Sequence, residues 1–556
     1  MFVIKHRLNI SNYLFRALCL LCICILPVVF PAATTSAELS EEPSLDEVKD
    51  TMKRATRFMV EKVSHRGGYV WSYLPDFSRR WGELEARETM IWIQPPGTAT
   101  MGHVFLDAYH ATGDEYYYAA AEQVAGAIIW AQHPAGGWNY VADFGGEASL
   151  RDWYKTIGKN AWRLEEFHHY YGNATFDDGG TAEAAKFLLR LYNEKLDPTY
   201  RPPLDKAISF MLDSQYPIGG WPQRYPLRHE YSRNGQLDYT SFITFNDDVA
   251  QENIDFLLMC YQVLGEQRVR EPVIRAMNAF LITQLGQPQP GWALQYTTEL
   301  QTAGARSYEP RSLSPATTAE NIRQLLKFYR MTGETKFLAR IPDALDWLDA
   351  VRLPRKNVTD GRTHPTFVEV GTGKTLYTHR RGSNVTNGEY YVDYEPGNEL
   401  IHYRSIRHVD VEQLRQLFKE AKALTPEVLT KGSPLKSKTA VELPRYFTLG
   451  NINLSDLNTR ALPTSSGKSL SEDAERLRKE LNQEGYWPVK LHYTTNSYRG
   501  GAPATVAAGN FSNTNVGDQW DTSPYETDDP VTGVSTGAYI KNMGVLIKYL
   551  VKNQQE

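Results

Sequence analysis

Two short stretches of the 556-residue chain place paired carboxylates directly before an apolar run. Asp177 and Asp178 lie in "FDDGGTAEAAKFLLRLY", and Asp247 and Asp248 lie in "ITFNDDVAQENI". Either pair could cap a helix, because Asp accepts hydrogen bonds from the free N–H groups of a first turn. A cap uses one carboxylate, however, and both sites carry two. Two converging acidic pairs predict a site for a hard cation such as Ca²⁺, which takes carboxylate and carbonyl oxygens.

Arginines and aromatic residues gather in two further stretches. "GGWPQRYPLRHEYSR" supplies Arg224, and "GARSYEPRS" supplies Arg306 and Arg311. Arginine suits bidentate contacts with carboxylates, although each of these side chains could simply be solvated at the surface. The aromatic residues beside them are Trp221, Tyr225, Trp292 and Tyr308. The combination predicts a groove for an acidic sugar chain, and the alternative is that the aromatic rings only pack the turns.

The elements that must position these residues recur along the chain. A glycine followed closely by an aromatic residue comes after an amphipathic segment in "GGYVWSY", "GGWNY", "GGWPQRY" and "PGWALQY", and less regularly in "GYWPVKL" from Gly485. Pairs of helix-like segments lie between these turns, such as residues 96–112 and 115–132. Gly113, Gly265 and Gly333 each follow a last apolar turn, which is a helix C-terminal signal.

Long helices joined by tight turns predict αα-hairpins that bury a shared face by packing side by side. Closing them into a ring gives an all-α fold, an α/α toroid (incomplete α/α barrel), with the turns around one cleft. An open helical solenoid is the alternative. We assign residues 45–354 to the toroid. Residues 355–556 form an irregular C-terminal extension whose last segment, "STGAYIKNMGVLIKYLVKN", predicts a helix that packs on and closes the ring.

The N-terminus has the layout of a secretory signal peptide. Lys5, His6 and Arg7 precede the apolar run "ALCLLCICILPVVFPA", and small residues end at Ala37. Residues 1–37 therefore predict export to a secreted or periplasmic location, and an uncleaved anchor is the alternative. The remaining chain keeps one cysteine, Cys260, so no internal disulfide is expected. The formal charge of −5 gives no bias towards nucleic acid or membranes, and we expect a monomer.

"GGWPQRYP", "ITFNDD" and "ARSYEPRSLS" resemble, in the same order, the motifs of family 10 polysaccharide lyases, the pectate lyases with an α/α toroid. "FDDGGTAEAAKFLLRLY" also resembles that family's Asp-Asn-Gly-Ala-Thr helix start. The resemblance runs from about residue 45 to 350, and its motifs are concentrated between residues 175 and 315.

The resemblance implies cleavage of polygalacturonate by β-elimination, with Ca²⁺ as the cofactor. It implies that Asp177 is the calcium and substrate aspartate, and that Asp247, with Asp248, is the second acidic position. Arg306 matches the arginine that removes the C5 proton. That proton is α to a carboxylate, so a cation on the carboxylate would stabilise the charge that develops. An arginine base is unusual, since a guanidinium holds its proton to a pH above 12.

Some residues depart from the family pattern. Asp178 stands where the family usually has Asn, and Ala293 and Tyr296 follow Trp292 where it has Cys and His. These changes bear on substrate preference and activity. Two other functions therefore stay open: an α/α-toroid hydrolase of uronate-containing oligosaccharides that uses Asp177 and Asp247 as acid and base, and a glycan-binding homologue without catalysis.

Overall fold

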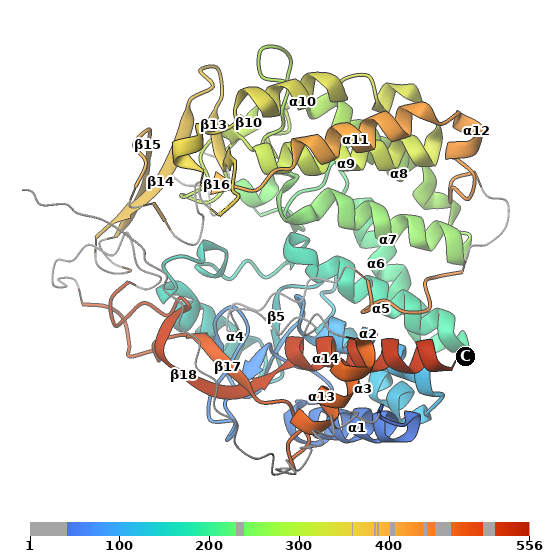
Figure 1. The fold of residues 1–556 in the computed structure, drawn as a ribbon. Coiled ribbons are helices and arrows are strands. Elements are labelled where there is room, and N and C mark those ends of the chain that lie inside the picture. The colour runs from blue at the N-terminus through green and yellow to red at the C-terminus, as the bar shows by residue number, and fades with distance from the viewer. Residues whose placement is uncertain are drawn as a thin grey trace, which may run out of the picture. The chain divides into compact units, whose positions relative to one another are not determined.

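Four helical hairpins follow one another along the chain (Figure 1). Their helices are α2 (Thr98–Thr112) with α3 (Glu115–Ala131), α5 (Gly180–Lys195) with α6 (Arg201–Asp213), α7 (Val249–Leu264) with α8 (Arg270–Thr283), and α9 (Pro315–Thr332) with α10 (Ile341–Ala350). The first helices are neighbours in a row, since α2 packs on α5 and α5 on α7, and the second helices cover that row. The hairpins confirm the predicted all-α, α/α-toroid class.

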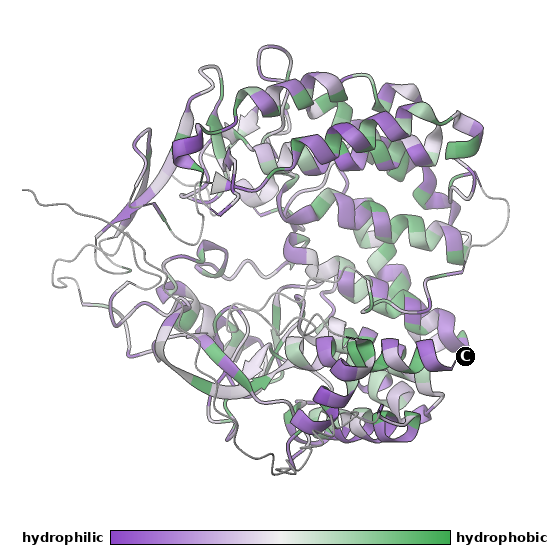
Figure 2. Ribbon diagram, viewed as in Figure 1, coloured by the Kyte–Doolittle hydropathy of each residue, from purple (hydrophilic) through white to green (hydrophobic). Residues whose placement is uncertain are grey.

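The chain is described by a computed structural model over residues 42–228, 238–358, 360–382, 385, 388–397, 399–400, 406–436, 442–450, 469–503 and 517–554. The predicted signal peptide at residues 1–37 lies outside these ranges. Within them, no helix is both long and apolar enough to cross a membrane. Figure 2 shows hydrophilic and apolar residues interleaved along outer helices such as α11 (Val411–Ala423), as expected where one face is buried.

Glycines end the hairpin helices as the sequence predicts. Gly113, Gly265 and Gly333 follow α2, α7 and α9 in the left-handed conformation, with φ of 70°, 65° and 75°. Each backbone N–H donates to a carbonyl of the last helical turn, to Tyr109, Cys260 and Tyr329 respectively. A side chain at these positions would strain the backbone, so glycine sets where each helix stops.

The glycine-aromatic turns lie directly against the next hairpin. A Cβ atom on Gly136 would come within 2.3 Å of the carbonyl oxygen of Lys206 in α6, and one on Gly219 within 2.2 Å of that of Arg275 in α8. Only glycine allows this approach. The tryptophan that follows ties the turn to its own hairpin, since the Trp138 indole N–H donates to the carbonyl of Ile128 at 2.7 Å.

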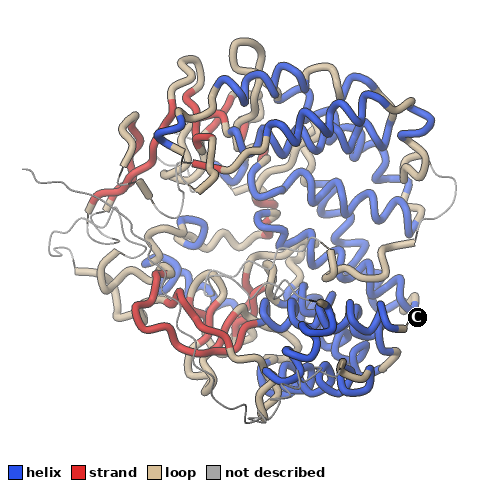
Figure 3. Tube along the Cα trace, in the orientation of Figure 1, coloured by secondary structure: helices blue, strands red, loops and turns tan. Residues whose placement is uncertain are grey.

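Short strands connect each glycine-aromatic turn to the loop that precedes the first helix of a hairpin. These strands gather at one end of the helices (Figure 3). The pairs are β4 (Met90–Trp92) with β5 (Val141–Asp143), β6 (Ala174–Thr175) with β7 (Arg224–Tyr225), and β8 (Ile243–Thr244) with β9 (Gln295–Tyr296), and β9 also pairs with β10 (Thr302–Ala303). The two acidic stretches follow β6 and β8. The ladders therefore fix both acidic loops beside the turns.

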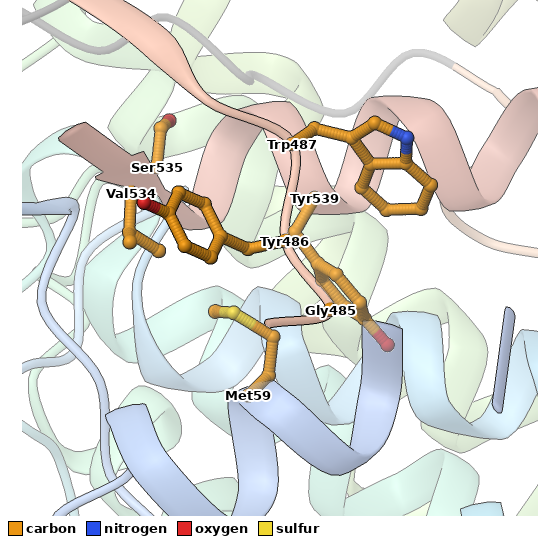
Figure 4. A pocket seen from close by; sticks show the side chains of 7 residues that line it. All are labelled: Met59, Gly485, Tyr486, Trp487, Val534, Ser535 and Tyr539. Atoms are coloured by element: carbon orange, nitrogen blue, oxygen red, sulfur yellow. The ribbon is translucent and has the colours of Figure 1, made fainter. Parts of the chain in front are cut away.

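The C-terminal extension repeats the hairpin plan once more. Helix α13 (Leu470–Glu480) leads to the turn at Gly485, and the Trp487 indole N–H donates to the Leu477 carbonyl at 2.8 Å. Figure 4 shows Tyr486 and Trp487 around a small cavity that Met59 and Tyr539 also line. The least regular of the predicted turns is thus built like the others.

Helix α14 (Thr536–Asn553) packs on α1 (Leu45–Phe58), α2 and α13. Strands β17 (Val489–Thr494) and β18 (Tyr525–Ser535) form one sheet with β1 (Ser72–Tyr73), β2 (Arg80–Trp81) and β3 (Glu85–Ala86). A second sheet joins β11 (Ser312–Leu313), β13 (Phe367–Glu369), β14 (Thr375–Arg381) and β15 (Glu389–Asp393). The division of the chain at residue 354, and closure of the ring by the extension, stay predictions.

Candidate active site

The two acidic loops adopt the same backbone conformation. Each is a single 3₁₀ turn, Asp177–Gly179 before α5 and Asn246–Asp248 before α7. Asp178 and Gly179 have φ of 49° and 70°, and Asp247 and Asp248 have φ of 51° and 55°. Asp178 is therefore the structural counterpart of Asp247, and Gly179 is that of Asp248. Neither loop forms a side-chain cap at its helix, so the capping interpretation is wrong for both pairs.

Three of the four predicted metal ligands lie together. Asp177, Asp178 and Asp247 each offer a carboxylate oxygen, and these oxygens lie within 4.8 Å of one another. We call these three residues the acidic cluster. Asp177 is fully buried, Asp178 is half-buried and Asp247 is exposed, so the cluster opens from the protein interior to the surface. The carboxylate of Asp178 also accepts a hydrogen bond of 2.8 Å from Nε2 of Gln94.

Asp248 lies outside the acidic cluster, which corrects its prediction as a metal ligand. It is the residue directly before α7, and its side chain is exposed. Desolvation at the helix start, together with the carboxylates of Glu252 and Glu320, raises the pKa of Asp248 to about 6. The sequence could not separate the two residues, because the turn that directs one carboxylate inwards directs the next one away.

Arg306 lies beside the acidic cluster with a side chain that is 3% exposed. Its Nη2 lies 2.8 Å from Oδ2 of Asp177, and its Nε lies 3.0 Å from Oε2 of Glu166. Its Nη1 lies 3.3 Å from Glu309 and 4.0 Å from Oδ2 of Asp247. One guanidinium thus faces four carboxylates, and the two short contacts fix its plane.

The excess of negative charge shows in the pKa values of the carboxyl groups. Desolvation and the neighbouring carboxylates raise the pKa of both Asp178 and Asp247 well above the ordinary range. Burial also raises the pKa of Glu166 and Glu309, although Arg306 opposes it. Burial acts on Asp177 in the same direction, but Arg306 and the hydrogen bonds to Asp177 together outweigh it, and the pKa of Asp177 is lowered. The site therefore lacks positive charge, which a cation would supply.

Sequence reasoning missed several residues of this site. Glu166 and Glu309 contact Arg306, and the hydroxyl of Tyr140 donates to Oδ2 of Asp177. Glu309 could have been found, since it lies three residues after Arg306 in the quoted motif "ARSYEPRS". No spacing or repeat marks Glu166, which reaches the site from the irregular segment before β6.

The predicted substrate-binding residues divide into buried and accessible ones. Arg224 is buried, its Nη1 lies 3.0 Å from Oδ1 of Asn139, and its guanidinium covers the ring of Tyr140. Tyr308 is buried, and its hydroxyl donates to Glu166 over 3.4 Å. Tyr225 is half-buried and Arg311 is exposed. Arg224 and Tyr308 therefore support the site from behind, and Tyr225 and Arg311 remain accessible.

Trp221 and Trp292 do not line a groove, which corrects their prediction as substrate-binding residues. Both are fully buried. Their indole N–H groups donate to the carbonyls of Met211 and Phe280, at 2.8 and 2.9 Å. The alternative that these rings pack the turns is the correct one for this pair. The departure at Tyr296 is also explained by packing, because its buried hydroxyl accepts the backbone N–H of Ala293 at 2.8 Å.

The acidic cluster fits a calcium ion in the chemistry and the spacing of its oxygens. Calcium binds oxygen ligands at about 2.3–2.6 Å, so two ligands on opposite sides of the ion lie about 5 Å apart. The 4.8 Å limit within the cluster matches that separation. Oδ1 of Asp177 is buried and has no hydrogen-bond partner among the described residues, so one ligand atom is uncommitted.

The helical hairpins thus carry an acidic cluster beside a buried arginine. Residues 151–384 match the family model described as pectic acid lyase. The match covers less than half of the chain, and it confirms the resemblance drawn from the motifs. The predicted enzyme class, a polysaccharide lyase, is confirmed with it. No curated protein matches the sequence.

Several solved structures are similar to this chain. The family 10 polysaccharide lyase from Cellvibrio cellulosa is 16% identical with a TM-score of 0.39, over 58% of this chain and 98% of that one. An unsaturated glucuronyl hydrolase specific for heparin is 9% identical with a TM-score of 0.37, over 92% and 99%. The α-1,6-mannanase of Salegentibacter sp. HEL1_6 is 12% identical with a TM-score of 0.35, over 91% and 100%.

Proposed function

We propose that the protein is a secreted pectate lyase that cleaves polygalacturonate by calcium-assisted β-elimination at 1,4-linked galacturonate. One observation carries the proposal: carboxylates from two neighbouring helix starts converge within 4.8 Å beside the guanidinium of Arg306. The family assignment of residues 151–384 supports the same reaction class. The substrate proposed here is a polyanion, and the acidic cluster can hold the cation that such a substrate needs.

Asp177, Asp178 and Asp247 would hold the Ca²⁺ ion. When bound, the ion stabilises the negative charge that develops on the uronate carboxylate as the C5 proton leaves. Asp177 connects the acidic cluster to Arg306, because its Oδ2 lies 2.8 Å from Nη2 of Arg306. The carboxylate of Asp177 thus positions Arg306 relative to the group that binds substrate.

Arg306 is the proposed catalytic residue. It takes the C5 proton, the electron pair of the broken C–H bond forms the C4–C5 double bond, and the C4–O4 bond breaks. The leaving oxygen then takes a proton, so the products are one unsaturated uronate end and one free hydroxyl end. Glu166 and Asp177 hold Nε and Nη2, which keeps the guanidinium in one plane. A guanidinium ordinarily keeps its proton far above neutral pH, so the rate should rise in the alkaline range.

The proposal includes export and a single-chain enzyme. The signal-peptide layout of residues 1–37 supports secretion, and the formal charge of −5 favours neither nucleic acid nor a membrane surface. Tyr225 and Arg311 are the accessible residues that we propose contact the substrate.

The test is to incubate the purified protein with polygalacturonate at alkaline pH and follow the ultraviolet absorbance of an unsaturated uronate. Absorbance should rise with calcium, stop with a chelator and be lost in Arg306→Ala. Arg330→Ala is the matched control, since it removes an exposed arginine at the far end of α9 and should retain turnover. New reducing ends without absorbance would instead indicate the hydrolase, and binding without either product would indicate the non-catalytic homologue.

A further inference from the structure

A pocket separate from the acidic cluster lies at the same end of the hairpins. It has a volume of about 360 Å³, within the range of about 300–1,000 Å³ typical of small-ligand sites. The turn after α3, strand β5 and the start of α4 (Glu147–Trp153) form one side of it, and Tyr170, Gly172 and Asn173 form the other. Most of this lining lies before residue 151, outside the stretch that matches the pectic acid lyase family.

Trp130, which stacks on the half-buried Phe144, forms one wall of this pocket. Trp130 is 49% exposed although it is a large apolar side chain, and its ring stacks on that of Phe144 with centroids 3.9 Å apart. The guanidinium of Arg66 lies over the Phe144 ring, 5.2 Å from its centroid, and so supports the pair. A flat, supported indole face offers the surface on which the C–H face of a sugar ring packs.

The polar groups around the pocket are amides and carboxylates. Asn139 and Asn173 line it. The amide of Asn139 donates one N–H to the Tyr154 hydroxyl, and that of Asn173 donates one to the Pro226 carbonyl. Each amide nitrogen carries a second N–H. Asp143 and Glu147 also line it. None of the described lining residues is Lys or Arg. These groups suit the hydroxyls of a sugar and disfavour a second carboxylate.

Two nearby arginines are paired with polar residues of the pocket lining. Arg224 lies behind Asn139 and Asn173 and bonds the side-chain oxygens of both. Arg151 pairs with Glu147 and covers the ring of Tyr170. His133 is neutral near pH 7, because burial lowers its pKa and both ring nitrogens contact the backbone, at Ala135 and Gly172. None of the described residues that line the pocket is therefore a cation that would neutralise a uronate, and the exposed Arg228 lies next to the lining residue Gly172.

A short series of contacts connects the pocket to the reaction centre. Asn139 binds Arg224, whose guanidinium lies 5.0 Å from the centre of the Tyr140 ring. The Tyr140 hydroxyl donates to Asp177, which binds Arg306. Three residues, Arg224, Tyr140 and Asp177, thus connect Asn139 of the pocket to Arg306.

We propose that this pocket binds an uncharged pyranose unit of the substrate chain and so directs the lyase to pectin that is not fully anionic. The inference rests on the proposed function for its polymer. A methyl-esterified galacturonate and a neutral hexose side chain share the required chemistry. Trp130 packs on the ring, and the amides and carboxylates bind its hydroxyls.

The experiment compares kcat/KM on fully de-esterified polygalacturonate, on the same polymer with partial methyl esters, and on a polygalacturonate that carries neutral hexose branches. Trp130→Ala should lower kcat/KM roughly tenfold on a substrate with uncharged units and by less than about twofold on the de-esterified polymer. Glu147→Lys should shift the preference towards the de-esterified polymer, since it adds a cation to the rim. Ile282→Ala, which shortens another exposed apolar side chain on α8, is the control.

The polymer on which Trp130→Ala lowers kcat/KM shows whether the uncharged unit is a methyl-esterified galacturonate or a neutral hexose. An equal loss on all three polymers, or no loss on any, would overturn the proposal. If the wild type forms no unsaturated product from any polymer, the proposed function fails instead. Calorimetric titration with an oligogalacturonide that carries one uncharged unit then tests the pocket alone: binding that Trp130→Ala weakens supports it, and undetectable binding overturns it.

Discussion

At the scale of single residues, the site depends on which of two adjacent carboxylates a tight turn directs inwards. Asp178 and Asp247 occupy equivalent left-handed positions in two loops, and both join the acidic cluster. The next residue is Gly179 in one loop and Asp248 in the other. Glycine adopts this conformation without cost, and an aspartate there is strained. The second loop therefore carries strain that the first one avoids.

The prediction at this scale is that Asp248→Gly stabilises the protein by about 1 kcal/mol. The change removes a left-handed side chain, and with it a carboxylate that faces Glu252 and Glu320. The midpoint of urea unfolding measures the effect. Gly179→Ala is the reciprocal variant and should lower the midpoint by a similar amount. A lower midpoint for Asp248→Gly would show that the carboxylate contributes more than its backbone conformation costs.

At the scale of helices, titratable side chains connect the first helices of successive hairpins. Glu183 in α5 lies 3.4 Å from His103 in α2, and Lys186 of α5 binds Glu252 in α7. Burial alone would raise the pKa of Glu183, but Lys186 and His103 outweigh it and lower that pKa to about 2. These contacts link three successive hairpins through one network.

The low pKa of Glu183 predicts a definite acid sensitivity. Its contribution to stability is complete above its ordinary pKa of 4.5 and is lost as pH falls from 4.5 towards about 2. Glu183→Gln should therefore flatten the fall in unfolding free energy across this interval, by up to roughly 3 kcal/mol. Urea unfolding at a series of pH values measures it. Glu271→Gln, at an exposed ion pair with Arg270, should leave the profile unchanged, and an unchanged slope in Glu183→Gln would refute the linkage.

A second element-scale contact binds the C-terminal extension to the hairpins. Asp107 in α2 is fully buried and accepts hydrogen bonds from Arg190 and from the backbone N–H groups of Phe447 and Thr448. The Phe447 ring also stacks on His103, with centroids 5.0 Å apart. A segment more than 330 residues along the chain is thereby fixed against the inner helices.

Asp107→Ala should cost about 3–5 kcal/mol of unfolding free energy, because it leaves the Arg190 charge buried without its partner. Thermal unfolding followed by circular dichroism measures the loss. Asp205→Ala breaks an exposed pair with Arg201 and should cost no more than about 1 kcal/mol. Equal effects of the two substitutions would contradict the assigned role of the buried pair.

At the scale of the whole molecule, the sequence indicates the hairpins well, because glycine ends α2, α7 and α9, and a glycine-aromatic turn follows α3, α6 and α8. The turn at Gly485 was predictable for the same reason. The direction of the Asp247 carboxylate towards the cluster and the burial of Trp221 were not predictable. In each turn, a shift of one residue would change which side chain points towards the protein interior. Glu166 has no sequence signal at all, since tertiary packing alone brings it to Arg306.

We propose that the acidic cluster is the calcium site of the lyase. The most direct test is to titrate calcium while following unsaturated product from polygalacturonate in the wild type, in Asp178→Asn and in Asp248→Asn. Asp178→Asn removes a charge from the cluster and should raise the half-activating calcium concentration more than about tenfold. Asp248→Asn changes the neighbouring carboxylate and should leave that concentration unchanged. An equal shift in both variants, or activity that persists in a chelator, would contradict the account.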